Sequence, residues 1–184
     1  EIITIPAEKG DPRNITQSVD AHDKFPAWSP DGKSIAYISD ATGEYQLYIK
    51  PQDGKGDAKL YKLNGAGFYA YPRWSPDGKK IAYVDNSRTL YILDVESGSI
   101  VAIDADEVYS PGDFRQILGS WSHDSRWIAY TKVLDTYFKQ VFIYSLDQGK
   151  SYPVTDGLSD ASEPVFDPEG KYLYFFASTD AGPV

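Results

Sequence analysis

The sequence predicts an all-β fold, a β-propeller segment built from four-stranded antiparallel blades. Three observations support this fold class: a repeat of about 46 residues, a tight-turn motif in each repeat, and an aromatic content of 15%. Aromatic and β-branched side chains fit the covered faces of β-sheets. A period of roughly 40 to 50 residues with several short strands per repeat is typical of propellers.

The repeat is anchored on an aromatic residue that precedes a turn. The anchors are Trp28, Trp74, Trp121 and Phe166, and they are separated by 46, 47 and 45 residues. The first two are followed by Ser-Pro-Asp-Gly, in which Pro presets φ, Asp suits the next position and Gly accepts a positive φ. The motif therefore predicts a hairpin between the first two strands of a blade, and we expect the four anchors to lie in the inter-blade core.

The repeat divides the chain into blades within a single propeller region, 1–184. We expect the chain to begin with a half blade, 1–16, made of the third and fourth strands of a blade. Three complete blades should follow at 24–64, 70–104 and 117–155, and a half blade made of first and second strands should end the chain at 163–178. The two half blades could pair and close a four-bladed ring, or the chain could be an open arc of a larger ring. Ordinary blade lengths favour the arc. Because the chain begins at Glu1 without a methionine, we expect a processed or truncated product.

Composition argues against several functional classes. The 18 basic and 27 acidic residues give a net charge of −9, whereas a nucleic-acid-binding protein usually carries a basic face. No apolar run approaches the roughly 18 residues that a membrane helix needs. Cysteine is absent, which removes disulfides, thiolate nucleophiles and cysteine-based zinc sites. We expect no nucleic-acid partner, no membrane span and no cofactor.

The sequence offers no catalytic or metal-binding arrangement. Of its two histidines, His22 precedes the first complete blade, and His123 stands at a turn position that the other copies fill with proline. No Gly-x-Ser-x-Gly motif of a nucleophile elbow is present. The aspartates fall mostly in turns, and no loop has the dense spacing of a calcium site. We therefore assign no catalytic residue and no metal ligand.

Candidate contact residues lie in the loops that enter the first strand of each blade. These loops crowd toward the propeller axis, and functional residues concentrate on loops held by a rigid scaffold. The candidates for a peptide channel are His22, Asp23, Phe68, Tyr69, Tyr71, Asp113, Phe114, Arg115 and Glu163. The alternative for the aromatic members is that they only pack the rim.

The repeat units resemble those shared by the periplasmic Tol-system protein, the prolyl-oligopeptidase group and the tricorn proteases. Longer strings, at 125–132, 144–151, 154–161 and 172–180, resemble the N-terminal propeller of tricorn-like serine peptidases. The resemblance implies an arc of a six- or seven-bladed propeller in a large cytoplasmic peptidase. In that family, propellers filter and channel peptides, while a PDZ module and a serine–histidine pair lie later in the chain.

We therefore expect a non-catalytic propeller segment of a tricorn-like peptidase, whose parent protein is a serine peptidase. Its expected partners are peptides or the rest of its own polypeptide. An arc also leaves apolar blade faces exposed, so we expect an oligomer. Two alternatives stay open: a Tol-like periplasmic protein-binding propeller, and the propeller of a prolyl-oligopeptidase-type hydrolase. A periplasmic or secreted location stays open as well.

Overall fold

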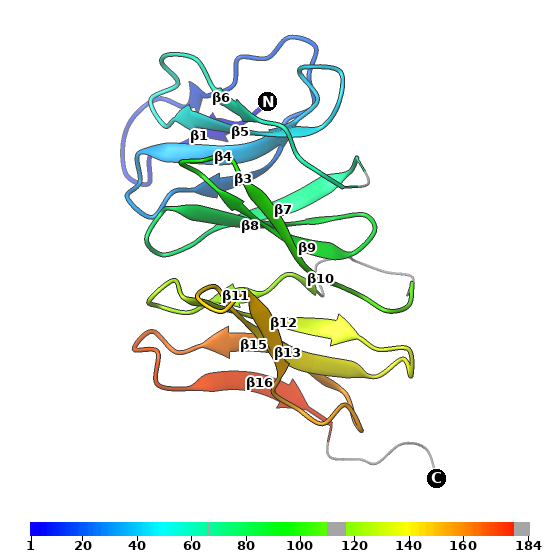
Figure 1. The fold of residues 1–184 in the computed structure, drawn as a ribbon. Helices are drawn as coiled ribbons and strands as arrows, with labels where there is room; N and C mark the ends of the chain where they lie inside the picture. The colour runs from blue at the N-terminus through cyan, green and yellow to red at the C-terminus, as the bar shows by residue number, and fades with distance from the viewer. Residues whose placement is uncertain (66, 110–116, 179–184) are drawn as a thin grey trace.

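The chain folds into a stack of antiparallel β-sheets (Figure 1). The computed structural model describes residues 1–65, 67–109 and 117–178, and within these ranges it contains sixteen strands in five sheets and no α-helix. Three sheets have four strands and two have only two. In each four-stranded sheet, consecutive strands pair with one another, which is the meander of a propeller blade. The predicted fold class is confirmed.

The strands succeed one another in the order of the repeat. The first two-stranded sheet contains β1 (Ile3–Thr4) and β2 (Arg13–Asn14). The first blade contains β3 (Lys24–Trp28), β4 (Ser34–Ser39), β5 (Gln46–Pro51) and β6 (Lys59–Tyr61). The second contains β7 (Tyr69–Trp74), β8 (Lys80–Asp85), β9 (Thr89–Asp94) and β10 (Ile100–Ala105). The third contains β11 (Ser120–Trp121), β12 (Trp127–Val133), β13 (Lys139–Ser145) and β14 (Lys150–Pro153). The last two-stranded sheet contains β15 (Ala161–Phe166) and β16 (Leu173–Ala177).

The turn between the first two strands of a blade is held by its own serine and aspartate. In the first blade the Ser29 hydroxyl donates to the Asp31 carboxylate at 2.6 Å, and the backbone N–H of Lys33 donates to the same oxygen at 3.0 Å. Gly32 adopts a φ of 68°, which glycine reaches without a steric penalty. The turn therefore closes the hairpin that the motif predicts.

The second strand of each complete blade forms the centre of the core. In β8, every residue from Ile81 to Asp85 is buried, and β4 and β12 carry the same Ile-Ala-Tyr run. Strands covered on both faces show continuous apolar runs instead of alternation. Separate clusters of buried side chains join the first blade to the second and the second to the third. Ile2 and Ile15 pack the first two-stranded sheet onto the first blade.

The anchor tryptophans of the second and third blades reach the preceding blade. The indole N–H of Trp74 donates to the carbonyl of Ala27 at 3.1 Å, and that of Trp121 donates to the carbonyl of Arg73 at 3.2 Å. Trp28 differs, because its side chain is 52% exposed. The assignment of Trp28 to the inter-blade core is therefore wrong for this chain. Its equivalent partner would be the first strand of a preceding blade, and the described part of the chain holds none before β3.

A buried ion pair reinforces the junction between the second and third blades. Arg88 lies 3.2 Å from Asp106, and their side chains are 3% and 2% exposed. The other oxygen of Asp106 accepts the backbone N–H of Val133 in the third blade at 2.9 Å. Burial raises the pKa of Asp106, against the lowering effect of the hydrogen bonds from Val133 and Arg88. Lys132 adds a second link, because its ammonium lies 3.0 Å from Asp104 of the second blade.

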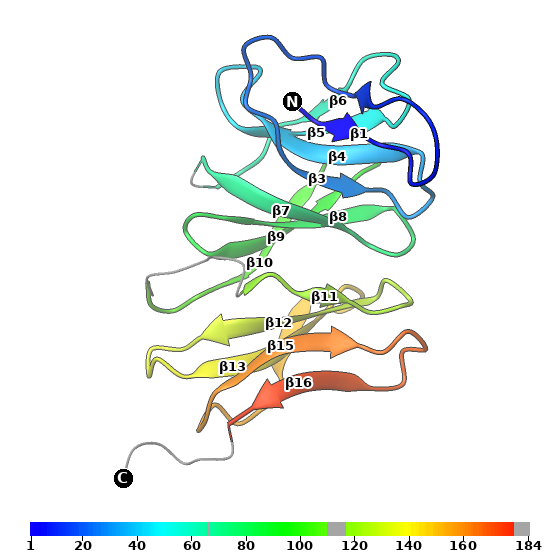
Figure 2. The same cartoon turned by 180° about the vertical axis from the view of Figure 1, so that it is seen from behind.

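The chain forms an open arc. Among the described strands, β1 pairs with β2 alone and β16 with β15 alone, so the two-stranded sheets do not complete each other. Seen from behind, these sheets lie at opposite ends of the stack (Figure 2). The predicted open arc is confirmed.

Replacing the anchor tryptophans should separate a packed position from an exposed one. We expect Trp74→Ala to lower the free energy of unfolding by about 3 kcal/mol, because it removes an aromatic side chain packed between blades. Trp28→Ala should lower it by less than about 1 kcal/mol, the range for an exposed position. Urea unfolding followed by circular dichroism measures both. Equal losses would show that Trp28 is packed in solution.

Asp94 should contribute to the pH dependence of stability. The backbone N–H and the hydroxyl of Ser97 both donate to Asp94 at 2.9 Å, and the Lys80 ammonium lies 3.1 Å away. These contacts lower the pKa of Asp94 from 3.8 to about 2. Because the folded pKa is depressed, the stabilisation is present above the unfolded pKa and is lost as the pH falls toward the folded pKa. The stability difference between wild type and Asp94→Asn should therefore shrink between about pH 5 and pH 2 in urea unfolding. A difference independent of pH over that range would contradict this account.

Candidate functional site

The first strands of neighbouring blades form the inner wall of the arc. β3 packs along β7, and β15 packs against β11 and β12. Blades of a propeller radiate from a central channel, so the strands that converge face the axis. Side chains that leave β3, β7, β11 and β15 on this side therefore line the axial surface.

Three of these four strands carry the same backbone distortion. Phe25, Tyr71 and Glu163 have φ values of 55°, 55° and 56°, and each precedes a proline. The ladder register shifts at all three positions, which marks a bulge. A positive φ is unfavourable for a bulky residue, and a residue before proline prefers an extended conformation. Such strain persists only where the surrounding structure imposes it, and it clusters at functional sites.

The third blade lacks the distortion. Leu118 and Gly119 stand where the other copies have the bulged residue and its proline. A Cβ atom on Gly119 would lie 2.1 Å from the carbonyl oxygen of Ala129 and 2.9 Å from a side-chain carbon of Ile128. The backbone at Gly119 is therefore pressed against β12, where only glycine fits. The first strand of this blade lies closer to its second strand than any side chain at position 119 would allow.

A cavity of about 560 Å³ adjoins this strand between the second blade, the third blade and the last two-stranded sheet. We call it the axial cavity. Its polar walls come from Arg73, Ser120, Lys139, Ser162 and Glu163, and its apolar walls come from Leu118, Pro164 and Val165. The cavity thus combines cations, an anion, hydroxyl groups and apolar surface.

Hydrogen bonds to the backbone hold the walls of the axial cavity in place. The Arg73 guanidinium donates to the carbonyl of Gly119 at 3.2 Å. The backbone N–H of Glu163 donates to the hydroxyl of Thr131 at 3.1 Å, which ties the bulge of β15 to the third blade. The backbone N–H of Lys139 donates to Asp160 at 2.9 Å. Such a site can accept and donate hydrogen bonds and pair with charges of either sign.

The structure distributes the sequence candidates over three places. Glu163 lines the axial cavity. Phe68 and Tyr69 line a smaller pocket at the beginning of β7. The ring of Tyr71 packs on Phe25, with centroids 4.6 Å apart and planes tilted by 56°. The remaining loop candidates Asp113, Phe114 and Arg115 lie outside the described residues.

His22 and Asp23 lie outside the axial cavity and make local contacts. The backbone N–H of His22 donates to Asp40 at 2.7 Å, and its ring nitrogen lies 3.2 Å from the same carboxylate. The Asp23 side chain is 2% exposed and accepts a hydrogen bond from the Ser18 hydroxyl. Burial alone would raise the pKa of Asp23, but hydrogen bonds led by that from Ser18 lower it. These contacts tie the N-terminal segment to the first blade.

The sequence reasoning missed several residues that line the axial cavity or the pocket at the beginning of β7. Gly119 replaces a proline that the other three copies share, so this break in the repeat was the available signal. Phe25 occupies the same repeat position as Tyr71 and could have been found with it. Arg73 and Lys139 carry no signal, because an isolated basic residue in a strand usually lies on a solvated face.

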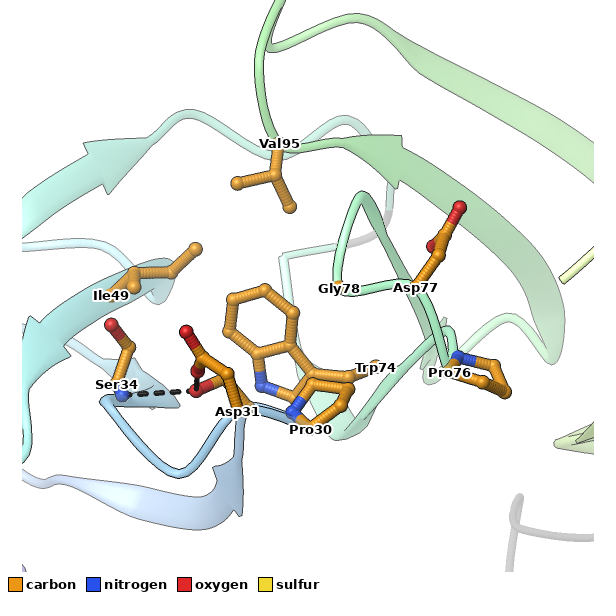
Figure 3. Close-up of a pocket in the computed structure, with 10 residues that line it drawn as sticks. Pro30, Asp31, Ser34, Ile49, Trp74, Pro76, Asp77, Gly78 and Val95 are labelled. Atoms are coloured by element: carbon orange, nitrogen blue, oxygen red, sulfur yellow. Dashed lines mark hydrogen bonds between the residues drawn. The ribbon is translucent and has the colours of Figure 1, made fainter.

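A second kind of recess lies at the opposite end of the blades, between neighbouring turns (Figure 3). The turns carrying Asp31 and Asp77 flank it around the indole of Trp74, and its volume is about 520 Å³. A recess of about 280 Å³ beside Phe166 repeats this arrangement after the third blade. At the middle junction, the Ser125 hydroxyl accepts the backbone N–H of Asp77 at 3.0 Å and bridges the turns. These recesses follow from the repeat itself, since they recur wherever two turns meet without such a bridge.

Two further features concern metals and membranes. Within residues 1–65, 67–109 and 117–178, no group of three or more histidine, aspartate or glutamate side chains is placed to hold a metal ion. The same part of the chain contains no helix with the length and apolar character needed to cross a membrane.

The meandering four-stranded blades and their converging first strands define a β-propeller segment. The family model of the tricorn protease second β-propeller domain matches residues 1–184, and the chain belongs to this family. It is 31% identical over 166 residues to a Bacillus subtilis protein named uncharacterized peptidase YuxL, covering 83% of this chain and 21% of that one. It is 32% identical over 100 residues to a putative tricorn-like protease C-terminal subunit of Sulfurisphaera tokodaii, covering 53% of this chain and 11% of that one. The chain thus spans 21% of one of these curated relatives and 11% of the other.

Solved structures share the fold. The crystal structure of the tricorn protease matches with a TM-score of 0.76 and 20% identity, covering 90% of this chain and 16% of that chain. TolB from Acinetobacter baumannii matches with a TM-score of 0.59 and 22% identity, over 92% of this chain and 41% of that chain. Oligogalacturonate lyase from Vibrio parahaemolyticus matches with a TM-score of 0.67 and 13% identity, covering 96% of this chain and 52% of that chain. At these identities, the likenesses show the fold alone.

Two glycine substitutions should test how closely the backbone at Gly119 is pressed against β12. We expect Gly119→Ala to lower the free energy of unfolding by about 3 kcal/mol or more, because the added methyl group overlaps a backbone oxygen. Gly32→Ala is the matched control, since Gly32 has a positive φ but no atom within 4 Å of an added Cβ. It should cost about 1 kcal/mol from backbone strain alone. Urea unfolding measures both, and equal losses would mean that β11 moves freely away from β12.

Proposed function

We propose that the chain is a non-catalytic propeller segment of a tricorn-like peptidase and that its axial cavity contacts peptides on their way to or from a distant active site. The observation that carries this proposal is the axial cavity itself. Its volume lies within the range of about 300 to 1,000 Å³ that is common for ligand sites. It also offers what a peptide backbone and mixed side chains require, namely hydrogen-bond donors and acceptors, both charges and apolar walls.

Two further observations support the proposal. The chain belongs to a family of tricorn protease propeller domains, and both curated relatives are named as a peptidase or a protease subunit. Within the described residues, neither His22 nor His123 accepts a hydrogen bond from a serine hydroxyl, so they form no serine–histidine pair of the kind that activates a nucleophile. The catalytic groups would then lie elsewhere in the parent protein.

The last two-stranded sheet suggests a second role, protein docking. Its exposed face carries large aromatic side chains at Tyr172, Tyr174 and Phe176, which are 64%, 62% and 71% exposed. Apolar patches of this kind mark surfaces that associate with other proteins. We propose that the rest of the parent polypeptide or a second copy covers this face. A Tol-like protein-binding propeller would use such a face, whereas a peptide channel uses the axial cavity.

Peptide-binding measurements distinguish these roles. We expect the chain to bind fluorescein-labelled peptides of mixed sequence weakly in fluorescence anisotropy. Arg73→Gln with Lys139→Gln should raise the Kd about tenfold, the effect of losing about 1.4 kcal/mol of charge-assisted contacts. Lys33→Gln, at an exposed turn far from the cavity, is the matched control and should change nothing. Unchanged affinity in the double variant, or an absence of binding by the wild type, would contradict the proposal.

The same peptides should survive incubation with the chain, because its described residues contain no activated nucleophile. A fluorogenic peptide assay measures this directly. Turnover that disappears on substitution of a serine or histidine within the chain would show that the segment is catalytic.

A further inference from the structure

We infer that a second pocket anchors one bulky apolar side chain of the peptide that the axial cavity contacts, an inference that rests on the proposed function. This pocket, the aromatic pocket, has a volume of about 280 Å³ and lies between the first two blades at the beginning of β7. Its residues are Lys24, Phe25, Tyr45, Phe68, Tyr69 and Asn86. Four of these six are aromatic, so its walls are ring surfaces with one cation and one amide beside them.

The rings of the aromatic pocket are arranged to receive a further apolar group. Tyr45 and Phe68 have centroids 5.8 Å apart and planes tilted by 45°. Aromatic pairs favour such tilted or offset contacts, so an additional ring or branched aliphatic chain can join them. Phe68 is 60% exposed, although it lies among three other aromatic residues. A ligand side chain in the pocket would remove part of that apolar surface from water.

Lys24 holds one wall in position. Its ammonium donates to the Tyr45 hydroxyl at 3.0 Å and lies 4.9 Å from the centroid of the same ring. The contact fixes the orientation of Tyr45 and leaves a positive charge beside the apolar pocket. Lys24 and the exposed Asn86 can therefore bind carbonyl oxygens of a peptide backbone while the rings hold its side chain.

The size of the aromatic pocket indicates one side chain as its occupant. Its volume falls just below the common range for whole ligands, about 300 to 1,000 Å³. A second copy of the chain would need a specific interface of roughly 1,200 to 2,000 Å² in total, far more surface than this pocket offers. A peptide needs only one side chain there, because the rest of it can extend toward the axial cavity.

The strand β7 connects the two sites and sets a register between them. Tyr69, at its beginning, lines the aromatic pocket, and Arg73, near its end, lines the axial cavity. The bulge at Tyr71 lies between these two residues, so the strand between them is shorter than about 13 Å, the length of four fully extended residues at roughly 3.3 Å each. An extended peptide lying along β7 would cover this length with at most about four residues. The bulky apolar residue should therefore lie within about four positions of the residues that contact Arg73.

A peptide series tests this inference. The probes are nine-residue peptides with blocked ends and a Gly/Ser/Gln background that carry one Phe, Leu or Ala at a fixed position. For the wild-type chain we expect the Phe peptide to bind at least about tenfold more tightly than the Ala peptide, with Leu between them. Phe68→Ala should reduce this preference to below about threefold. Tyr137→Ala, at an exposed aromatic residue of the third blade, is the matched control and should keep it.

The outcomes separate this inference from the proposed function. If all peptides bind the wild type equally well, peptide binding stands and the aromatic pocket is not an anchor. If no peptide binds, the proposed function and the anchor are both wrong. Arg73→Gln should weaken every peptide by a similar factor and keep the preference for Phe. If sedimentation shows a dimer that Phe68→Ala converts to a monomer, the occupant is a second copy and the inference is overturned.

Discussion

The contact of each blade with the face of its predecessor is the interaction on which the rest of the structure depends. A single four-stranded sheet cannot cover both faces of its second strand, so strands such as β8 are buried only because blades lie on either side. Trp74 and Trp121 add to this packing, and each also donates an indole hydrogen bond to the first strand of the preceding blade. Trp28 occupies the same position of the repeat, but no first strand of a preceding blade lies beside it in the described chain, and its side chain is exposed. Stability in such an array is approximately a sum over blades and junctions.

The blades could be predicted because their causes are local. The Ser-Pro-Asp-Gly turn contains its own hydrogen bonds, and the apolar run of the second strand needs only to be covered. The exposure of Trp28 could not be predicted from the motif, since its burial would need a neighbouring strand that the described chain does not supply. The left-handed backbone of Phe25 and Tyr71 runs against the usual preference of a residue before proline. Packing between blades overrides that preference, and no single repeat reveals it.

The candidate site could be predicted only in part, because it too depends on contacts between strands that a single repeat does not reveal. Loops entering the first strands pointed to Glu163, Phe68 and Tyr69, which line the axial cavity or the aromatic pocket. The axial cavity itself adjoins Gly119, whose importance rests on the distance to a backbone oxygen of the next strand. A missing proline in a degraded repeat looks like loss of a motif, but here it removes the bulge that the other first strands share. The site thus lies where β11, which lacks the bulge, meets blades whose first strands carry it.

The bridge between Ser125 and Asp77 makes the turn edge of the arc uneven. Together with the pair of Arg88 and Asp106, it joins the second and third blades at both ends of their shared junction. In the described structure the junctions on either side keep open recesses at their turns. The turn edge of the arc is therefore closed at the middle junction and recessed at the two flanking junctions, where the turns that carry Asp31, Asp77 and Asp124 stay accessible.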